Sequence, residues 1–325
     1  MKPLAKLIGQ PLAVELLERA IAKNRIAPAY LFVGADGIGK AFAAKCFTEM
    51  LMIDETENYV SACKKIYAGN HPDFLWVEPT YNDKGTLLTA KETTEKGLKR
   101  KNAPKIRIEQ IREISQFLAR PPLKCDQSVV VIESAELMAE SAGNALLKTL
   151  EEPGQATIIL IAPSIDSILS TLVSRCQIIP FSRLSEEHLK LVLYRQDAAQ
   201  VLDYQQLIKM SQGCPGKAIA DWQKLREIPS ELLSKLTKLP ENVIDGLMLA
   251  KEITKEIELE SQIWLADYLQ YLYWDKHRKT KLIEGLEKVK KTLIRYVQPR
   301  LVWDCFFLDI ITNDSEDLQE RYLFY

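Results

Sequence analysis

The apolar positions in the first half of the chain alternate between short continuous runs and runs with helical spacing. Continuous β-branched runs predict buried strands, whereas apolar residues recurring every three or four positions predict helices. The predicted strands are Tyr30–Val33, Phe74–Val77, Val129–Ile132, Thr157–Ile161 and Gln177–Phe181. The predicted helices are Gln10–Ala22, 40–52, Ile108–Leu118 and 141–151. Strands that alternate with helices in this way favour an α/β domain with a parallel sheet covered on both faces.

After Phe181 the pattern becomes helical almost throughout. Ser185 precedes two glutamates, which is typical of a capped helix start. The stretch 211–216 reads as a turn between helices, and Pro229 and Pro240 bracket a predicted linker. We therefore expect an α/β domain over 1–183, a small helical lid over 184–224 and an all-α collar domain over 225–325.

The segment 81–105 lacks apolar periodicity. It carries seven Lys or Arg against three Asp or Glu, so it is basic within a chain whose net charge is −1. A solvated loop is the plain interpretation, and a loop that meets the phosphates of DNA is the sharper one. The near-neutral total argues against a protein that coats DNA by bulk electrostatics.

Composition narrows the class of protein further. The 325 residues are 47% hydrophobic and 27% charged, which excludes a mainly disordered chain. Six scattered cysteines do not resemble a disulfide framework. Charges interrupt the first apolar stretch and no apolar run is long enough to span a membrane. We expect a reduced, cytoplasmic protein without a membrane anchor.

A candidate phosphate-binding loop follows the first predicted strand. Gly34, Gly37, Gly39 and Lys40 fit G-x-x-x-x-G-K, with a helix predicted directly afterwards. In this pattern backbone N–H groups at a helix start surround a phosphate and the lysine neutralises its charge. The next residue should be Ser or Thr, whose hydroxyl binds Mg²⁺, but it is Ala41. ATP or ADP could still occupy this degenerate site.

The strand Val129–Ile132 ends at a second candidate position. Hydrolysing enzymes of this class place an Asp there for Mg²⁺, followed by a Glu that polarises water. Here Glu133 keeps a carboxylate and Ser134 replaces the base. Loss of a general base typically costs about 10²–10⁴ in rate. Glu136 lies two residues too far along the chain to replace the base simply.

Two further runs carry a resemblance. Asn144-Ala-Leu-Leu-Lys-Thr-Leu-Glu-Glu-Pro153 and Ser174-Arg175-Cys176 resemble the AAA+ subunits of bacterial clamp loaders. The string Ala68-Gly-Asn-His71-Pro-Asp73 and the Ile108–Leu118 helix are similar to the delta prime type within the DNA polymerase III holoenzyme. The resemblance covers about residues 5–220, and the remainder matches only in size and helical character.

The resemblance implies a place in a heteropentamer with gamma/tau and delta subunits, which opens a sliding clamp and loads it onto primed DNA. It implies that Arg175 acts in trans as an arginine finger on ATP held by a neighbouring subunit. An ion pair with only a structural role is the alternative. Ala162 stands where hydrolysing relatives place a polar sensor, and Lys217 stands at the second sensor, where an Arg is usual. A subunit of this type would not itself hydrolyse ATP.

Metal binding is not expected. Relatives carry a four-cysteine zinc module before the Gly-Asn-His-Pro-Asp string, but this region holds only Cys63, and Cys63 with His71 cannot close a tetrahedral site. Two rival functions remain: an ATP-hydrolysing gamma/tau-type motor subunit, and an independent P-loop kinase or transferase. The second would need the Mg²⁺ hydroxyl and the base that Ala41 and Ser134 do not supply.

Overall fold

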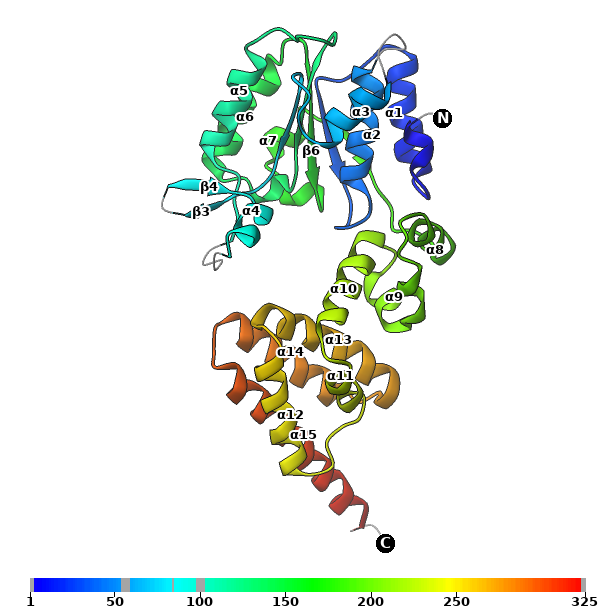
Figure 1. Ribbon diagram of the computed structural model, residues 1–325, viewed down its shortest axis with the longest axis vertical. Helices are drawn as coiled ribbons and strands as arrows, with labels where there is room; N and C mark the ends of the chain where they lie inside the picture. The colour runs from blue at the N-terminus through cyan, green and yellow to red at the C-terminus, as the bar shows by residue number, and fades with distance from the viewer. Residues whose placement is uncertain (1–2, 54–58, 84, 98–102, 323–325) are drawn as a thin grey trace. The chain divides into compact units, whose positions relative to one another are not determined.

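The computed structural model describes residues 3–53, 59–83, 85–97 and 103–322 (Figure 1). The chain forms two compact units, the first comprising Met1–Val192 with Cys214–Gly216 and the second Leu193–Gly213 with Lys217–Tyr325. The three-part division with boundaries at 183 and 224 stays a prediction.

A five-stranded parallel sheet forms the centre of the first unit, in the order β2-β5-β6-β1-β7. All five predicted strands are confirmed, with ends that differ by at most one residue from the prediction. They are β1 (Ala29–Val33), β2 (Phe74–Val77), β5 (Ser128–Ile132), β6 (Ala156–Ala162) and β7 (Gln177–Pro180). The three central strands are buried at every position, which explains why they appear as continuous apolar runs.

Helices cover both faces of this sheet, as Figure 1 shows around β6. On one face lie α5 (Ile108–Leu118), α6 (Glu140–Glu151) and α7 (Ser170–Val173), and on the other α1 (Pro11–Ala22), α2 (Lys40–Met52) and α3 (Tyr59–Tyr67). Successive strand residues face opposite layers. Leu31 packs in the core with α5 and α6, whereas the Tyr30 ring meets Phe47 of α2 edge-on, 5.1 Å between centroids.

The basic segment contains regular structure where a loop was expected. The hairpin β3 (Tyr81–Asp83) and β4 (Thr86–Leu88) is followed by α4 (Ala90–Glu95). Thr89 and Glu92 form a capping box, in which the Thr89 hydroxyl accepts from the Glu92 N–H and the Glu92 carboxylate accepts from the Thr89 N–H. The interpretation of 81–105 as a solvated loop is therefore wrong for β3, β4 and α4. Residues 84 and 98–102 lie outside the described residues, and contact of this segment with DNA stays a prediction.

Short 3₁₀ helices connect several elements: η1 (Pro3–Lys6), η2 (Ala135–Leu137), η3 (Ile165–Ser167) and η4 (Ala199–Asp203). The α-helices after β7 are α8 (Glu186–Arg195), α9 (Gln205–Ser211), α10 (Pro215–Glu227), α11 (Ser230–Leu236), α12 (Val243–Glu256), α13 (Leu259–His277), α14 (Thr280–Ile294) and α15 (Pro299–Tyr322). The linker expected between Pro229 and Pro240 contains α11, because a proline just before a helix does not interrupt it. No helix within the described ranges is long and apolar enough to cross a membrane.

The core of the second unit is rich in aromatic side chains whose polar atoms are satisfied. Trp264 stacks on Tyr268 with 5.5 Å between centroids, and its indole donates to Asp221 at 2.8 Å. The Trp303 indole donates to Gln262 at 3.0 Å. These bonds remove the cost of burying the indole N–H groups, so the helices can pack around large rings.

Candidate functional site

The phosphate-type loop has the backbone that its sequence predicted. β1 ends at Val33 and α2 begins at Lys40, with Gly39 before it in a positive-φ conformation of 107°. At Gly34 the chain passes so close to β7 that an added Cβ would lie 2.6 Å from the carbonyl oxygen of Phe181. A side chain is therefore excluded at Gly34 by space and disfavoured at Gly39 by backbone conformation.

Lys40 is turned inward onto its own loop. Its side chain is buried, and Nζ donates to the carbonyl oxygens of Gly34 and, at 3.0 Å, of Ala35. Asp36 Oδ1 lies 3.4 Å from the same amine. Within the first unit, Gly216, which precedes the candidate second-sensor residue Lys217, donates its N–H to Gly37 O at 2.8 Å. The loop is thus bonded internally at the lysine that would meet a phosphate.

The carboxylate at the metal position is held by a residue that the sequence did not single out. Oε2 of Glu133 accepts a hydrogen bond from the indole Nε1 of Trp76 at 2.9 Å. Nζ of Lys45 lies 4.9 Å from the centroid of the Trp76 ring, within cation–π range. Burial raises the pKa of the Glu133 carboxyl above its usual range, opposed by the Trp76 hydrogen bond.

The residues after Glu133 do not rebuild a hydrolytic centre. Ser134 has φ 50° and ψ 52°, a left-handed conformation that few non-glycine residues adopt. Glu136 Oε2 is buried without a hydrogen-bond partner in the described structure. Burial raises the pKa of Glu136, and the negative charge of Asp36 adds to the rise. Ala162, at the end of β6, presents only its carbonyl, which accepts from Gly34 N at 3.3 Å.

Arg175 lies outside this cluster, in the turn between α7 and β7. Its Nη2 donates to Glu151 Oε1 at 2.8 Å, and its Nη1 donates to the Thr171 carbonyl at 3.1 Å. The side chains of Arg175 and Glu151 are 38% and 54% exposed, so the pair is solvated. The ion pair considered as an alternative role therefore exists, but an exposed pair of this kind adds at most about 1 kcal/mol to stability.

Lys217, the candidate second-sensor residue, belongs to the second unit and lies in the first turn of α10. Its nearby acidic partner is Asp221 one turn later, whose burial raises its pKa while Lys217 lowers it. Its assignment to the nucleotide site remains a prediction.

Among the residues that the structure describes, one cluster has side chains of metal-ligand type: His71, Asp73 and Cys125. The Asp73 carboxylate accepts three backbone N–H groups, from Leu123, Lys124 and Cys125 at 2.7–3.0 Å. His71 Nδ1 accepts the Asp73 N–H at 3.2 Å, whereas a metal-bound imidazole normally donates its other ring N–H. These hydrogen bonds fasten the 121–125 loop to Asp73, which is a structural role rather than metal binding.

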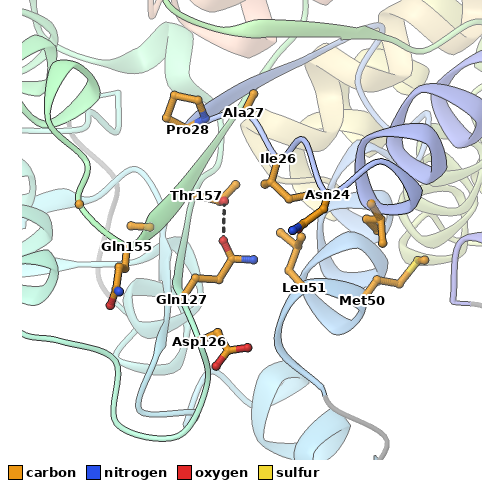
Figure 2. Close-up of a pocket in the computed structure, with 13 residues that line it drawn as sticks. Asn24, Ile26, Ala27, Pro28, Met50, Leu51, Asp126, Gln127, Gln155 and Thr157 are labelled. Carbon is orange, nitrogen blue, oxygen red and sulfur yellow. Dashed lines mark hydrogen bonds between the residues drawn. The ribbon is translucent and has the colours of Figure 1, made fainter.

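A cavity of about 530 Å³ lies at the amino-terminal ends of the strands, opposite the ends that lead into the phosphate-type loop (Figure 2). Asn24, Pro28, Gln127 and Thr157 are among the residues that line it, and the Thr157 hydroxyl donates to Gln127 Oε1 at 3.1 Å. Parallel α/β sheets bind ligands beyond the carboxyl ends of their strands, and this cavity is at the amino ends. It is therefore separate from the phosphate-type loop.

Two family models match the chain. The model described as DNA polymerase III, delta subunit, matches residues 9–185, and that of the cyanobacterial DNA polymerase III delta prime C-terminal domain matches residues 187–310. The solved DNA polymerase III gamma subunit-related protein of Thermotoga maritima has a TM-score of 0.55 at 18% identity, covering 92% of this chain and 98% of that one. This likeness shows a shared fold.

Curated relatives agree with the family models. The delta prime subunit of Bacillus subtilis is 33% identical over 58% of this chain and 53% of its own length. That of Pseudomonas aeruginosa is 30% identical over 69% of this chain and 65% of its own length. The tau subunit of Bacillus subtilis is 29% identical over 55% of this chain and 29% of its own length. The chain thus spans 53% and 65% of the length of these two delta prime relatives. Because the model described as DNA polymerase III, delta subunit, matches more than half of the chain, the chain belongs to that family.

Proposed function

We propose that this chain is the delta prime-type subunit of a DNA polymerase III clamp loader, acting in the cytoplasm. In this proposal it joins gamma/tau and delta subunits in a heteropentamer that loads a sliding clamp onto primed DNA. Arg175 acts as an arginine finger on ATP held by the adjacent gamma/tau-type subunit. The chain does not turn over ATP by itself.

The residues of its own candidate nucleotide site support the proposal that the chain does not turn over ATP by itself. Ala41 offers no hydroxyl for Mg²⁺, and Ser134 offers no carboxylate base. Glu133 is bonded to Trp76, and Lys40 is bonded to carbonyls of its own loop. Nucleotide could occupy the loop only after Lys40 is released from these contacts. Two side chains required for hydrolysis are therefore missing, at positions 41 and 134. The other two, Glu133 and Lys40, are hydrogen-bonded to other groups of the chain.

The exposed guanidinium of Arg175 is the observation that supports its role as an arginine finger on a neighbouring subunit. A buried arginine would serve packing, but this one is at the surface, on the segment between β6 and β7 that also carries the exposed apolar side chains Ile165 and Leu169. Exposed apolar residues on the same segment as a solvated arginine are typical of a surface that meets another protein. A finger supplied in trans can contribute about 10³–10⁵ to hydrolysis in the best-studied NTPases.

Reconstitution with gamma/tau and delta subunits tests the proposal. Arg175→Ala should strongly reduce DNA-stimulated ATP hydrolysis and clamp loading, while native mass spectrometry still detects the full complex. Arg175→Lys should recover little, since an ammonium lacks the planar fork of donors. Normal hydrolysis by the Arg175→Ala complex would refute the finger assignment.

A gamma/tau-type motor is the second candidate, favoured by the retained G-x-x-x-x-G-K loop and by the tau relative. It predicts that the isolated chain hydrolyses ATP and that Lys40→Ala abolishes the hydrolysis. We expect negligible turnover by the isolated chain and an unchanged rate for the complex that contains Lys40→Ala. Turnover that depends on Lys40 would support the motor assignment instead.

A further inference from the structure

Glu151 and Arg175 lie on elements that pack against each other. Glu151 is the last residue of α6, and Arg175 follows α7 by two positions. Leu169, just before α7, packs so closely on α6 that a Cβ added to Gly143 would lie 2.7 Å from its Cδ1. The packing of α6 against α7 therefore fixes the positions from which the two charged side chains meet.

Helix stability alone does not favour a carboxylate at the place of Glu151. The carboxyl end of a helix carries partial negative charge, which repels an acidic side chain and attracts a basic one. The residue nevertheless directs Oε1 to the Arg175 guanidinium at 2.8 Å. The ion pair with Arg175 therefore explains the carboxylate at position 151, whereas the stability of α6 does not.

The contacts of Arg175 fix its head without using all its donors. A guanidinium has five N–H donors. The described contacts use three of them: Nη1 meets the Thr171 carbonyl and, at 3.4 Å, the Ser174 hydroxyl, and Nη2 meets Glu151. The other N–H groups, including that of Nε, make no contact among the described residues and stay available to an outside ligand.

We infer that Glu151 is a positioning residue, which holds the Arg175 guanidinium in the orientation that receives a phosphate of a neighbour's nucleotide. The inference rests on the proposed finger role of Arg175. Arginine has a long side chain with many rotamers, and a finger contributes fully only when its donors are aligned with the transferring group. Thr171 anchors one nitrogen of the fork and Glu151 the other, so together they fix the plane of the guanidinium.

The test compares Glu151→Gln with Glu152→Gln in the reconstituted complex, using DNA-stimulated ATP hydrolysis. Glu152 is the adjacent exposed glutamate and makes no ion pair among the described residues, so its substitution is a control of equal charge change. Exposed ion pairs shift equilibria by up to about fivefold. We expect Glu151→Gln to lower kcat about two- to fivefold with an unchanged KM for ATP, and Glu152→Gln to behave as wild type.

The same substitution in an Arg175→Ala background separates positioning from a structural role. If Glu151 acts through Arg175, Arg175→Ala/Glu151→Gln should hydrolyse ATP at the rate of Arg175→Ala alone. A further loss in this background, a loss of assembly by Glu151→Gln, or an equal effect of Glu152→Gln would overturn the inference. A wild-type kcat for Glu151→Gln, together with a strongly impaired Arg175→Ala, would also overturn the inference about Glu151. That pair of results would leave the proposed function intact. An unimpaired Arg175→Ala would overturn the proposed finger role of Arg175 itself.

Discussion

The indole of Trp76 donates a 2.9 Å hydrogen bond to the carboxylate of Glu133, across the neighbouring parallel strands β2 and β5. A carboxylate at the end of β5 would be placed to hold Mg²⁺ in a hydrolysing relative. Here its Oε2 is bonded to an uncharged donor and its pKa is raised by burial. The chain thus retains the acidic group and satisfies it with a side chain of its own.

Trp76→Phe should destabilise the first unit. Phenylalanine keeps most of the ring but lacks the N–H, so the half-buried Glu133 carboxylate loses its donor. Such a loss costs roughly 1–3 kcal/mol in free energy of unfolding. Urea unfolding at pH 7 measures it, with Trp274→Phe as the control because that indole is 41% exposed. Equal losses in the two variants would show that the hydrogen bond adds nothing.

Glu133→Gln should remove part of the pH dependence of stability. The pKa of Glu133 is raised from its ordinary value of 4.5, first by burial, so the folded chain holds this proton more tightly than the unfolded chain. Stability is therefore lost as the pH rises from 4.5 through the folded pKa. The amide stays uncharged and can still accept from Trp76. The variant should gain stability relative to wild type over this range, as unfolding free energies between pH 4 and 8 would measure. Parallel profiles would contradict the prediction.

Asp73→Ala should release the loop 121–125. Three backbone N–H groups would lose a charged acceptor, and we expect a loss of roughly 2–4 kcal/mol in unfolding free energy. Asp126→Ala provides the control, since Asp126 is exposed on the same stretch. Thermal and urea unfolding measure both variants. If Asp126→Ala lost as much, the three hydrogen bonds would not be the cause.

The lowered pKa of Asp73 also predicts that the folded chain loses stability in acid. Burial by itself would raise its pKa, but the three N–H donors outweigh it and the pKa is lowered from 3.8. The stability that it supplies is present above pH 3.8 and is lost as the pH falls through the folded pKa. Asp73→Ala should therefore lose less stability on acidification than wild type, and a difference that is constant with pH would refute this.

Ala41→Thr/Ser134→Glu should not convert the isolated chain into an ATPase. The double substitution restores a hydroxyl and a carboxylate, but Glu133 remains bonded to Trp76 and Lys40 to its own loop. A glutamate at position 134 would also have to adopt the left-handed conformation of Ser134. Phosphate release assays should detect no turnover. Turnover that Lys40→Ala abolishes would mean that the two substituted positions alone prevent hydrolysis.

The sequence predicted the central sheet well because its three central strands are buried on both faces and so consist almost entirely of apolar residues. The hairpin at Tyr81–Leu88 was missed because its three-residue strands are half exposed and carry no apolar run. The Thr89–Glu92 capping box was the one available indication of α4. Prolines around α11 suggested a linker, although both lie outside the helix itself.

The pairing partners at the site could not be predicted in the same way. Trp76 and Glu133 are 57 positions apart and meet because β2 and β5 are neighbours, which depends on strand order. Glu151 and Arg175 are 24 positions apart and meet through the packing of α6 on α7. The loop glycines and Lys40 needed only local spacing, but the inward bonds of Lys40 depend on the path of the backbone.

Strand β6 has a consequence for how the protein can vary. It is bonded to β5 on one side and β1 on the other, its last residue accepts from Gly34, and the segment that leaves it leads through α7 to Arg175. The phosphate-type loop and Arg175, the proposed finger, are therefore both positioned by β6. A substitution that shifts β6 would displace both together. If Arg175 acts as proposed, the backbone of the phosphate-type loop therefore stays constrained even where the loop itself binds no nucleotide.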